Sequence, residues 1–169
     1  SPLTDRTIQG LYSPGSTFKM IVAIAALKYK VIQSTDKVFC EGKISFGDRF
    51  FHCWKNKGHG SMDITSAIKE SCDVFFYDLS IRVGIDKIAK VAKDFGLGQI
   101  YPFEILNQKK GIVPSKKWKK ETLNENWYGG ETLIAAIGQG YVLSTPLQLA
   151  VMTSRIASGG KKVLPSILK

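Results

Sequence analysis

The sequence predicts one domain of mixed α/β (α+β) class, in which helices dominate and strands are few and short. A long apolar segment and two helix-capping signals indicate helices. Only residues 37–60 combine glycines and aromatic residues in the way that short strands and turns require. With 169 residues, of which 44% are hydrophobic and 22% charged, the chain is long enough to bury a core.

The first predicted helix follows a turn. Residues 12–16 contain a Pro-Gly pair that predicts this turn, and the apolar residues 17–27 predict a buried helix that ends near Lys28. Residues 37–60 are interrupted by glycines and predict a short hairpin or an irregular loop.

Two further helices are predicted in the middle of the chain. The first begins at the N-cap Asp63 and delivers residues 71–73 at its end; its apolar stripe is Ile64, Ala67 and Ile68. Residues 74–83 are dense in Phe and Tyr and predict a buried segment. The second helix is stopped by Gly96 at its C′ position, and its apolar face is Ile85, Ile88, Ala89, Ala92 and Phe95.

The last third of the chain begins with a loose pattern. Residues 97–128 include glycine, proline and many lysines, and predict a long surface connection. A final helix is predicted from Thr145 and Gln148, which form a capping box around Pro146, and it runs to Ser158.

The charge favours anionic partners without naming one. The chain has 24 basic and 14 acidic residues and a net charge of +10, with six of the lysines between residues 109 and 120. Nucleic-acid binding is therefore one alternative, but no DNA- or RNA-binding motif accompanies the lysines, so we expect no nucleic-acid partner. No apolar run reaches the ~18 residues of a membrane-spanning helix, and residues 1–10 do not resemble a signal peptide. We expect a soluble globular piece.

Ser16 and Lys19 form the most informative pattern. They lie one turn apart at the start of the predicted buried helix, so the hydroxyl and the amine can approach each other. Burial and the helix amino end both disfavour an ammonium there, so a neutral Lys19 could take the Ser16 proton and activate the nucleophile. The alternative is that Ser16 only caps the helix and Lys19 extends to solvent, because S-x-x-K by itself is a common pattern.

A second motif, Ser71-Cys72-Asp73, favours the catalytic interpretation of Ser16 and Lys19. Together they resemble the set S-x-x-K, S-x-N and K-T-G of the penicillin-recognising serine enzymes. Longer stretches resemble class B penicillin-binding proteins, in particular their elongation branch, penicillin-binding protein 2. These stretches are residues 2–6, 10–19, Trp54, 58–60, 71–77, 138–141 and Thr145-Pro146.

The resemblance implies peptidoglycan D,D-transpeptidation. Ser16 would attack the D-Ala-D-Ala carbonyl of a stem peptide, with Lys19 as the base. Ser71 would relay the proton to the leaving amine, and Asp73 would orient Lys19 and the substrate amide. β-Lactams would trap the same serine. The resemblance also implies a parent protein anchored in the inner membrane, with this domain in the periplasm, working with a membrane-embedded glycan polymerase.

The sequence departs from the family pattern in two places. Asp73 stands where most of the superfamily has Asn, and no K-T-G or K-S-G motif occurs in the 169 residues. We therefore expect residues 1–169 to be a partial transpeptidase (penicillin-binding) domain, with a helical lobe around Ser16 and an incomplete antiparallel sheet. A serine β-lactamase or penicillin-sensing domain shares S-x-x-K but needs a deacylation base or a signalling linkage, and neither is recognisable here. An inactive zinc-binding remnant is the third alternative.

Cys40, Cys53, His59 and Cys72 predict one of two arrangements. Three thiolates and an imidazole can close a tetrahedral structural zinc site, or Cys40 and Cys53 can form a disulfide that leaves Cys72 free. The resemblance favours zinc, because the elongation branch tends to bind zinc here with Asp, Cys and His ligands. Cys72 would then tie the second motif to the preceding loop. His52 is expected to face solvent from a strand.

The missing third motif leads to a first prediction. In the family its strand supplies one of two oxyanion donors, and losing one such donor costs about 10² to 10³ in rate. We therefore expect these 169 residues alone to be acylated poorly, if at all, by a fluorescent penicillin. Covalent labelling of Ser16 at a rate typical of intact transpeptidases would contradict this expectation.

Overall fold

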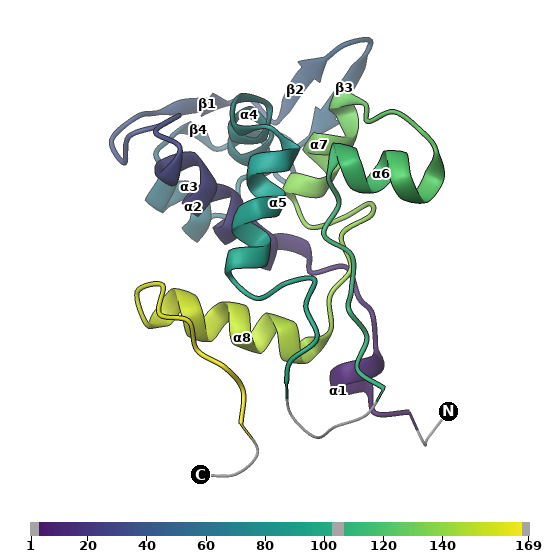
Figure 1. Ribbon diagram of the computed structural model, residues 1–169. Helices are drawn as coiled ribbons and strands as arrows, with labels where there is room; N and C mark the ends of the chain where they lie inside the picture. Colours follow the sequence, from purple (N-terminus) through teal and green to yellow (C-terminus); the bar gives the residue numbers. More distant parts are fainter. Residues whose placement is uncertain (1–3, 103–106, 167–169) are drawn as a thin grey trace.

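The computed structural model describes residues 4–102 and 107–166, and it places a helical body next to two small antiparallel sheets, with α1 and α8 at the opposite end (Figure 1). In chain order the elements are α1 (Arg6–Gln9), a 3-10 turn (Gly15–Phe18), α2 (Lys19–Lys28), β1 (Val38–Cys40), β2 (Lys43–Phe46), β3 (Arg49–His52), β4 (Gly60–Met62), α3 (Ile64–Lys69), α4 (Asp73–Val83), α5 (Ile85–Asp94), α6 (Lys116–Leu123), α7 (Gly129–Ala136) and α8 (Pro146–Ala157).

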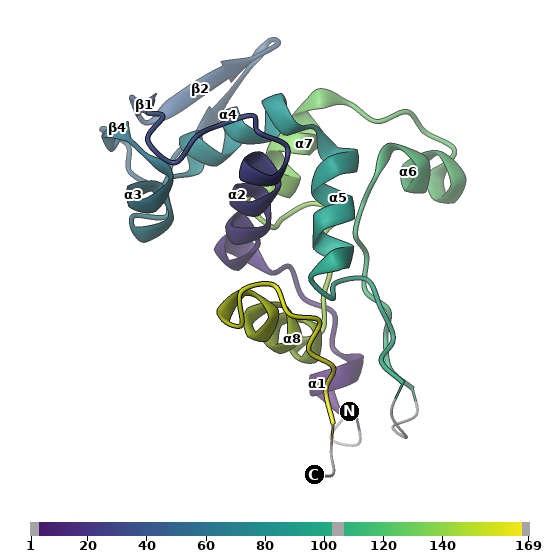
Figure 2. The ribbon, with the colours of Figure 1, turned by 60° about the vertical axis from the view of Figure 1, so that its left-hand side comes forward.

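Helix α4 is the centre of the core. Most of its residues are buried, and Phe75, Phe76 and Leu79 are fully so. Helices α2, α5 and α7 pack around it, and Figure 2 shows the four helices gathered together, with α8 and α1 at the far end of the molecule. The prediction of a buried segment over residues 74–83 is confirmed, and burying these large side chains supplies the main hydrophobic stabilisation of the fold.

The strands form two separate antiparallel pairs. β1 pairs with β4, so that Cys40 lies opposite Gly60, and β2 pairs with β3 in a hairpin, so that Lys43 lies opposite His52. These pairs confirm the strand and turn character of residues 37–60. His52 is exposed at the end of β3, as predicted.

The predicted helix ends are largely confirmed. Asp63 forms a capping box with Ser66, and Thr145 forms one with Gln148. The stripe predicted on α3 is only partly buried: Ile68 is 42% exposed, because this short helix turns no more than Ile64 and Ala67 into the core. The helix over residues 17–27 begins with a 3-10 turn instead of an α-helical turn.

The prediction of one long surface connection over residues 97–128 is wrong in part. Ser115 caps helix α6, and Lys119 in this helix is almost completely buried. The residues of α6 are mostly polar, so no apolar stripe marks the helix in the sequence. Helix α7, which begins with two glycines, was also not predicted, because glycine disfavours helix interiors.

Lys119 joins α6 to α7. Its Nζ lies 2.5 Å from Glu131 Oε1 and 3.2 Å from Glu125 Oε2, and it faces the rings of Tyr128 and Tyr141. The hydrogen bond to Glu131 raises the pKa of Lys119 and outweighs the opposing effect of burial. Lys119 is therefore a charged residue that links α6 to α7 through an ion pair with Glu131.

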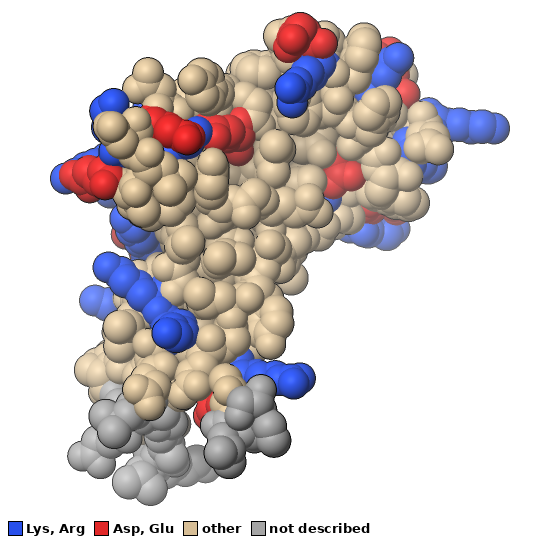
Figure 3. Space-filling view, turned by 90° about the vertical axis from the view of Figure 1, so that its right-hand side faces the viewer, with Lys and Arg blue, Asp and Glu red and all other residues tan. Residues whose placement is uncertain are grey.

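One face of the molecule carries its charge in a scattered way. On the face shown in Figure 3, basic side chains are separated by uncharged surface and acidic side chains lie among them, so this face has no continuous basic patch. Each helix within the described residues is too short or too polar to cross a bilayer.

The buried position of Lys119 leads to a second prediction. Lys119→Ala should lower the midpoint of thermal unfolding by roughly ten degrees, because it leaves the partly buried carboxylate of Glu131 without its cation. Lys117→Ala, on the same helix, removes an exposed contact with Glu121 and should change the midpoint by no more than about two degrees. Calorimetry of both variants checks this, and equal effects would contradict it.

Candidate active site

The 3-10 turn presents Ser16 at the surface. Gly15 has a φ of 57°, and its N–H donates to the Gly138 carbonyl at 3.0 Å. Gly138, at a φ of 69°, approaches so closely that a Cβ there would lie 2.2 Å from the Gly15 oxygen. Gly138, two residues after the end of α7, therefore fixes the position of the turn that carries Ser16, which is exposed.

Lys19 is buried, with a relative exposure of 2%. Its Nζ donates to the Ser71 carbonyl at 2.9 Å, to Ser71 Oγ at 2.9 Å and to Asp73 Oδ1 at 2.6 Å. Three acceptors surround the Lys19 nitrogen. Lys19 therefore does not extend to solvent, and Ser16 is not the cap of α2, whose N-cap position is Phe18.

Ser71 connects Lys19 to Ser16. Its Oγ lies 2.9 Å from Lys19 Nζ and 3.0 Å from Ser16 Oγ. Hydroxyl groups both donate and accept, so this line of three polar atoms can carry a proton in either direction. The contact between Ser16 and Lys19 expected from their spacing thus runs through Ser71.

The turn between α3 and α4 holds Ser71 and Asp73. Ser71 has a left-handed backbone, with a φ of 52°, and Asp73 begins α4. The second carboxylate oxygen of Asp73 accepts the backbone N–H of Trp54 at 2.9 Å. Trp54 was noted in the sequence only as part of the resemblance, because nothing in its local pattern predicts that it lies beside Asp73.

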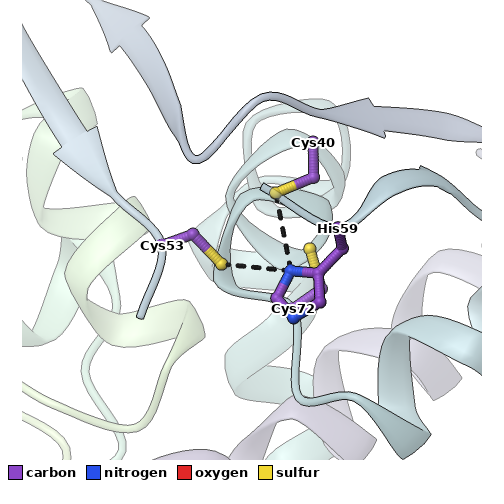
Figure 4. Close-up of side chains that lie close together, drawn as sticks. All are labelled: Cys40, Cys53, His59 and Cys72. Atoms are coloured by element: carbon purple, nitrogen blue, oxygen red, sulfur yellow. Dashed lines mark hydrogen bonds between the residues drawn. The ribbon is translucent and has the colours of Figure 1, made fainter. Parts of the chain in front are cut away.

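Cys40, Cys53, His59 and Cys72 come together next to this turn (Figure 4). Their ligand atoms lie within 4.8 Å of one another. His59 Nδ1 is 3.6 Å from the Cys40 sulfur and 3.5 Å from the Cys53 sulfur, and all three cysteines are buried free thiols. Cys40 is the last residue of β1 and Cys53 directly follows β3. His59 directly precedes β4, and Cys72 directly precedes α4.

Two side chains of this cluster have shifted pKa values. Burial raises the pKa of the Cys72 thiol, and the neighbouring Cys40 adds to that effect. Burial, followed by the charge of Lys55, lowers the pKa of His59, so the imidazole is neutral at pH 7 and able to act as a ligand. Three sulfurs and one imidazole nitrogen are a donor set that zinc prefers, and the residues present fit such an ion.

The line of Ser16, Ser71 and Lys19 suits serine acyl transfer with a lysine as base. A comparison with protein families agrees, because the family described as "Penicillin binding protein transpeptidase domain" matches residues 1–169. The chain belongs to this penicillin-binding protein transpeptidase family.

Named relatives and solved structures support the family assignment. The chain is 36% identical to "Peptidoglycan D,D-transpeptidase MrdA" of Haemophilus influenzae and 37% identical to that of Acinetobacter baumannii, over 99% of this chain and 26% and 25% of those proteins. A crystal structure of Pseudomonas aeruginosa PBP2 in complex with WCK 5153 matches with a TM-score of 0.93 and 41% identity, over 96% of this chain and 38% of that one. The chain spans about a quarter of the length of these two named relatives.

The contact between Gly138 and Gly15 leads to a third prediction. Gly138→Ala should lower the free energy of unfolding by about 2–4 kcal/mol, because it adds a steric clash to the cost of a left-handed alanine. Gly159 also has a positive φ, of 71°, but has open space around it, so Gly159→Ala should cost only about 1–2 kcal/mol. Denaturant unfolding of both variants measures the difference; a cost at Gly138 no larger than at Gly159 would show that the approach is not tight.

Proposed function

We propose that the chain is the nucleophile-bearing part of a peptidoglycan D,D-transpeptidase of the elongation branch, and that β-lactams acylate the same serine. One observation carries the proposal: Ser71 Oγ lies within hydrogen-bond distance of both Ser16 Oγ and Lys19 Nζ. The names of the relatives support the reaction class, and a Mycobacterium tuberculosis penicillin-binding protein A with a TM-score of 0.80 is described as an acyl-enzyme complex.

Acylation begins at Ser16. Its Oγ attacks the carbonyl carbon between the two D-Ala residues of a stem peptide, while its proton passes to Ser71 and the Ser71 proton passes to a neutral Lys19 amine. Asp73, 2.6 Å from Lys19, stabilises the ammonium that forms.

Collapse of the tetrahedral intermediate breaks the C–N bond. Lys19 returns a proton through Ser71 to the departing D-Ala amine, and an ester of Ser16 remains. In a β-lactam the same C–N bond lies in the ring, so the leaving amine stays attached to the acyl group. An amine from a neighbouring stem peptide then attacks the ester, gives its proton back along the same path and releases Ser16.

The competing functions have less support. The named relatives are transpeptidases, which favours cross-linking over a β-lactamase, a penicillin sensor or an inactive remnant. A nucleic-acid partner has no motif in the sequence, and the scattered charge of Figure 3 does not favour one.

A structural zinc ion belongs to the proposal. Cys40, Cys53, His59 and Cys72 would hold it, with His59 binding through the Nδ1 that faces two of the sulfurs. Four protein ligands would leave no position for a reacting water, so the ion would supply stability rather than catalysis. Because Cys72 lies between Ser71 and Asp73, the ion would hold the second motif in place.

The proposal extends to location and partners. The domain would lie on the periplasmic side of the inner membrane, in a membrane-anchored protein that works with a membrane-embedded glycan polymerase to maintain cell shape. Two related solved structures support such assemblies by their descriptions: PBP2 with MreC from Helicobacter pylori, and a peptidoglycan synthase complex that coordinates polymerization and crosslinking.

A fourth prediction tests the catalytic roles in the complete polypeptide that the gene encodes. Ser16→Ala should abolish labelling by fluorescent penicillin, and Lys19→Met and Ser71→Ala should each lower the acylation rate about 10²- to 10⁴-fold, the range for lost acid–base catalysis. Ser61→Ala, on the exposed side of β4, is the control and should label normally. Undiminished labelling of the Ser16 variant would refute the proposal.

A fifth prediction tests the metal. The purified chain should contain about one equivalent of zinc. His59→Ala should lose the metal and unfold at a lower temperature, whereas His52→Ala should keep it, since His52 is exposed on β3. Removing the metal with a chelator should likewise lower the unfolding temperature. Well under one equivalent of metal, together with a Cys40–Cys53 bridge by mass spectrometry, would overturn the zinc assignment.

A further inference from the structure

We propose that Trp54 is a positioning residue for proton transfer, holding Ser71 and Asp73 in the geometry that links Lys19 to Ser16. This inference rests on the proposed function. It starts from the backbone of Ser71, which has a φ of 52° although glycine is the usual residue in that conformation.

The turn after α3 is a Schellman motif with serine at the C′ position. The Ser71 N–H donates to the Ile68 carbonyl at 3.2 Å and the Cys72 N–H donates to the Ala67 carbonyl at 2.9 Å. A serine there is strained by about 1–2 kcal/mol, so the surrounding structure must hold it. Position 71 needs a serine despite this strain, because a glycine there would provide no hydroxyl between Lys19 and Ser16.

The indole of Trp54 supplies such a restraint. Its Nε1–H donates to the carbonyls of Glu70 and Ser71, at 3.1 Å each. These carbonyls lie at the C-terminal end of α3, where helix carbonyls have no partner inside the helix. The Ser71 carbonyl thus accepts from Trp54 on one side and from Lys19 on the other.

The backbone of Trp54 restrains the second residue of the motif. Its N–H donates to Asp73 Oδ2 at 2.9 Å, while Asp73 Oδ1 accepts from Lys19. Trp54 thus donates to both functional residues of the turn, from the main chain and from the side chain.

Packing alone does not explain this tryptophan. Trp54 is 62% exposed, and its ring contacts the edge of His59 at a centroid distance of 5.2 Å. A tryptophan held mainly by the hydrophobic effect would be buried. Here the ring lies at the surface, while the backbone N–H and the indole N–H of Trp54 both donate to the turn formed by residues 70–73.

The test removes one N–H and keeps the ring. In the complete polypeptide, Trp54 is replaced by 3-benzothienylalanine, in which sulfur takes the place of the indole N–H, and by 5-fluorotryptophan, which keeps the N–H. The matched control is 3-benzothienylalanine at Trp127, whose indole donates to Thr132 Oγ1 at 2.8 Å. Acylation by a fluorescent penicillin is resolved into a non-covalent dissociation constant and a first-order acylation rate.

The benzothienyl variant at Trp54 should acylate about tenfold more slowly with an unchanged dissociation constant, the effect of one lost hydrogen bond on the reacting arrangement. The fluorotryptophan variant and the Trp127 control should stay within about twofold of the parent protein. Acylation at the parent rate by the benzothienyl variant, or an equal loss at Trp127, would overturn the inference.

A second measurement does not depend on activity. In the 169-residue chain, the Ser71 carbon chemical shifts report its left-handed backbone, and they should move toward ordinary values in the benzothienyl variant at Trp54 but not in the control. Unchanged shifts would overturn the positioning role. A parent polypeptide that is not acylated at all would instead overturn the proposed function, and the chemical shifts would still decide the role of Trp54.

Discussion

The hydrogen bonding of the buried Lys19 amine is the interaction on which the site depends. A polar group with 2% exposure is tolerated only when it is hydrogen-bonded. Its three acceptors come from two residues, Ser71 and Asp73, on one short turn. The first turn of α2 and the start of α4 are therefore locked together across the core. This lock places Ser16, which precedes Lys19 by three residues, against the Ser71 hydroxyl.

Two short segments, residues 53–54 and 71–73, contribute both to the cysteine cluster and to the contacts around Lys19 and Asp73. Cys72 belongs to the cluster while its neighbours Ser71 and Asp73 contact Lys19. Cys53 belongs to the cluster while the next residue, Trp54, donates to Asp73. Adjacent residues point in different directions, so each segment can contribute to both sites. The cluster and the contacts of Lys19 are therefore joined directly through the backbone.

The opposite side of the nucleophile is held by a chain of packing contacts. Lys119 joins α6 to the first turn of α7 through Glu131, and Gly138, two residues after the end of α7, fits against Gly15. The turn that carries Ser16 is therefore contacted by the backbone of Gly138 and by the hydroxyl of Ser71. Rigid positioning of this kind is what lets a weakly nucleophilic hydroxyl react at one geometry.

The sequence by itself determined the capped helices at Asp63 and Thr145 and the buried segment over residues 74–83, because caps and apolar runs are local patterns. The candidate residues of both sites came from short motifs together with the family resemblance. The burial of Lys119 in a polar helix, the left-handed Ser71 and the position of Trp54 were decided only by the tertiary structure. The physical reason is that each depends on partners far along the chain: Glu131 for Lys119, Lys19 for Ser71, and Asp73 for Trp54. Local propensity carries no signal for such partners, and only the folded core brings them within hydrogen-bond distance.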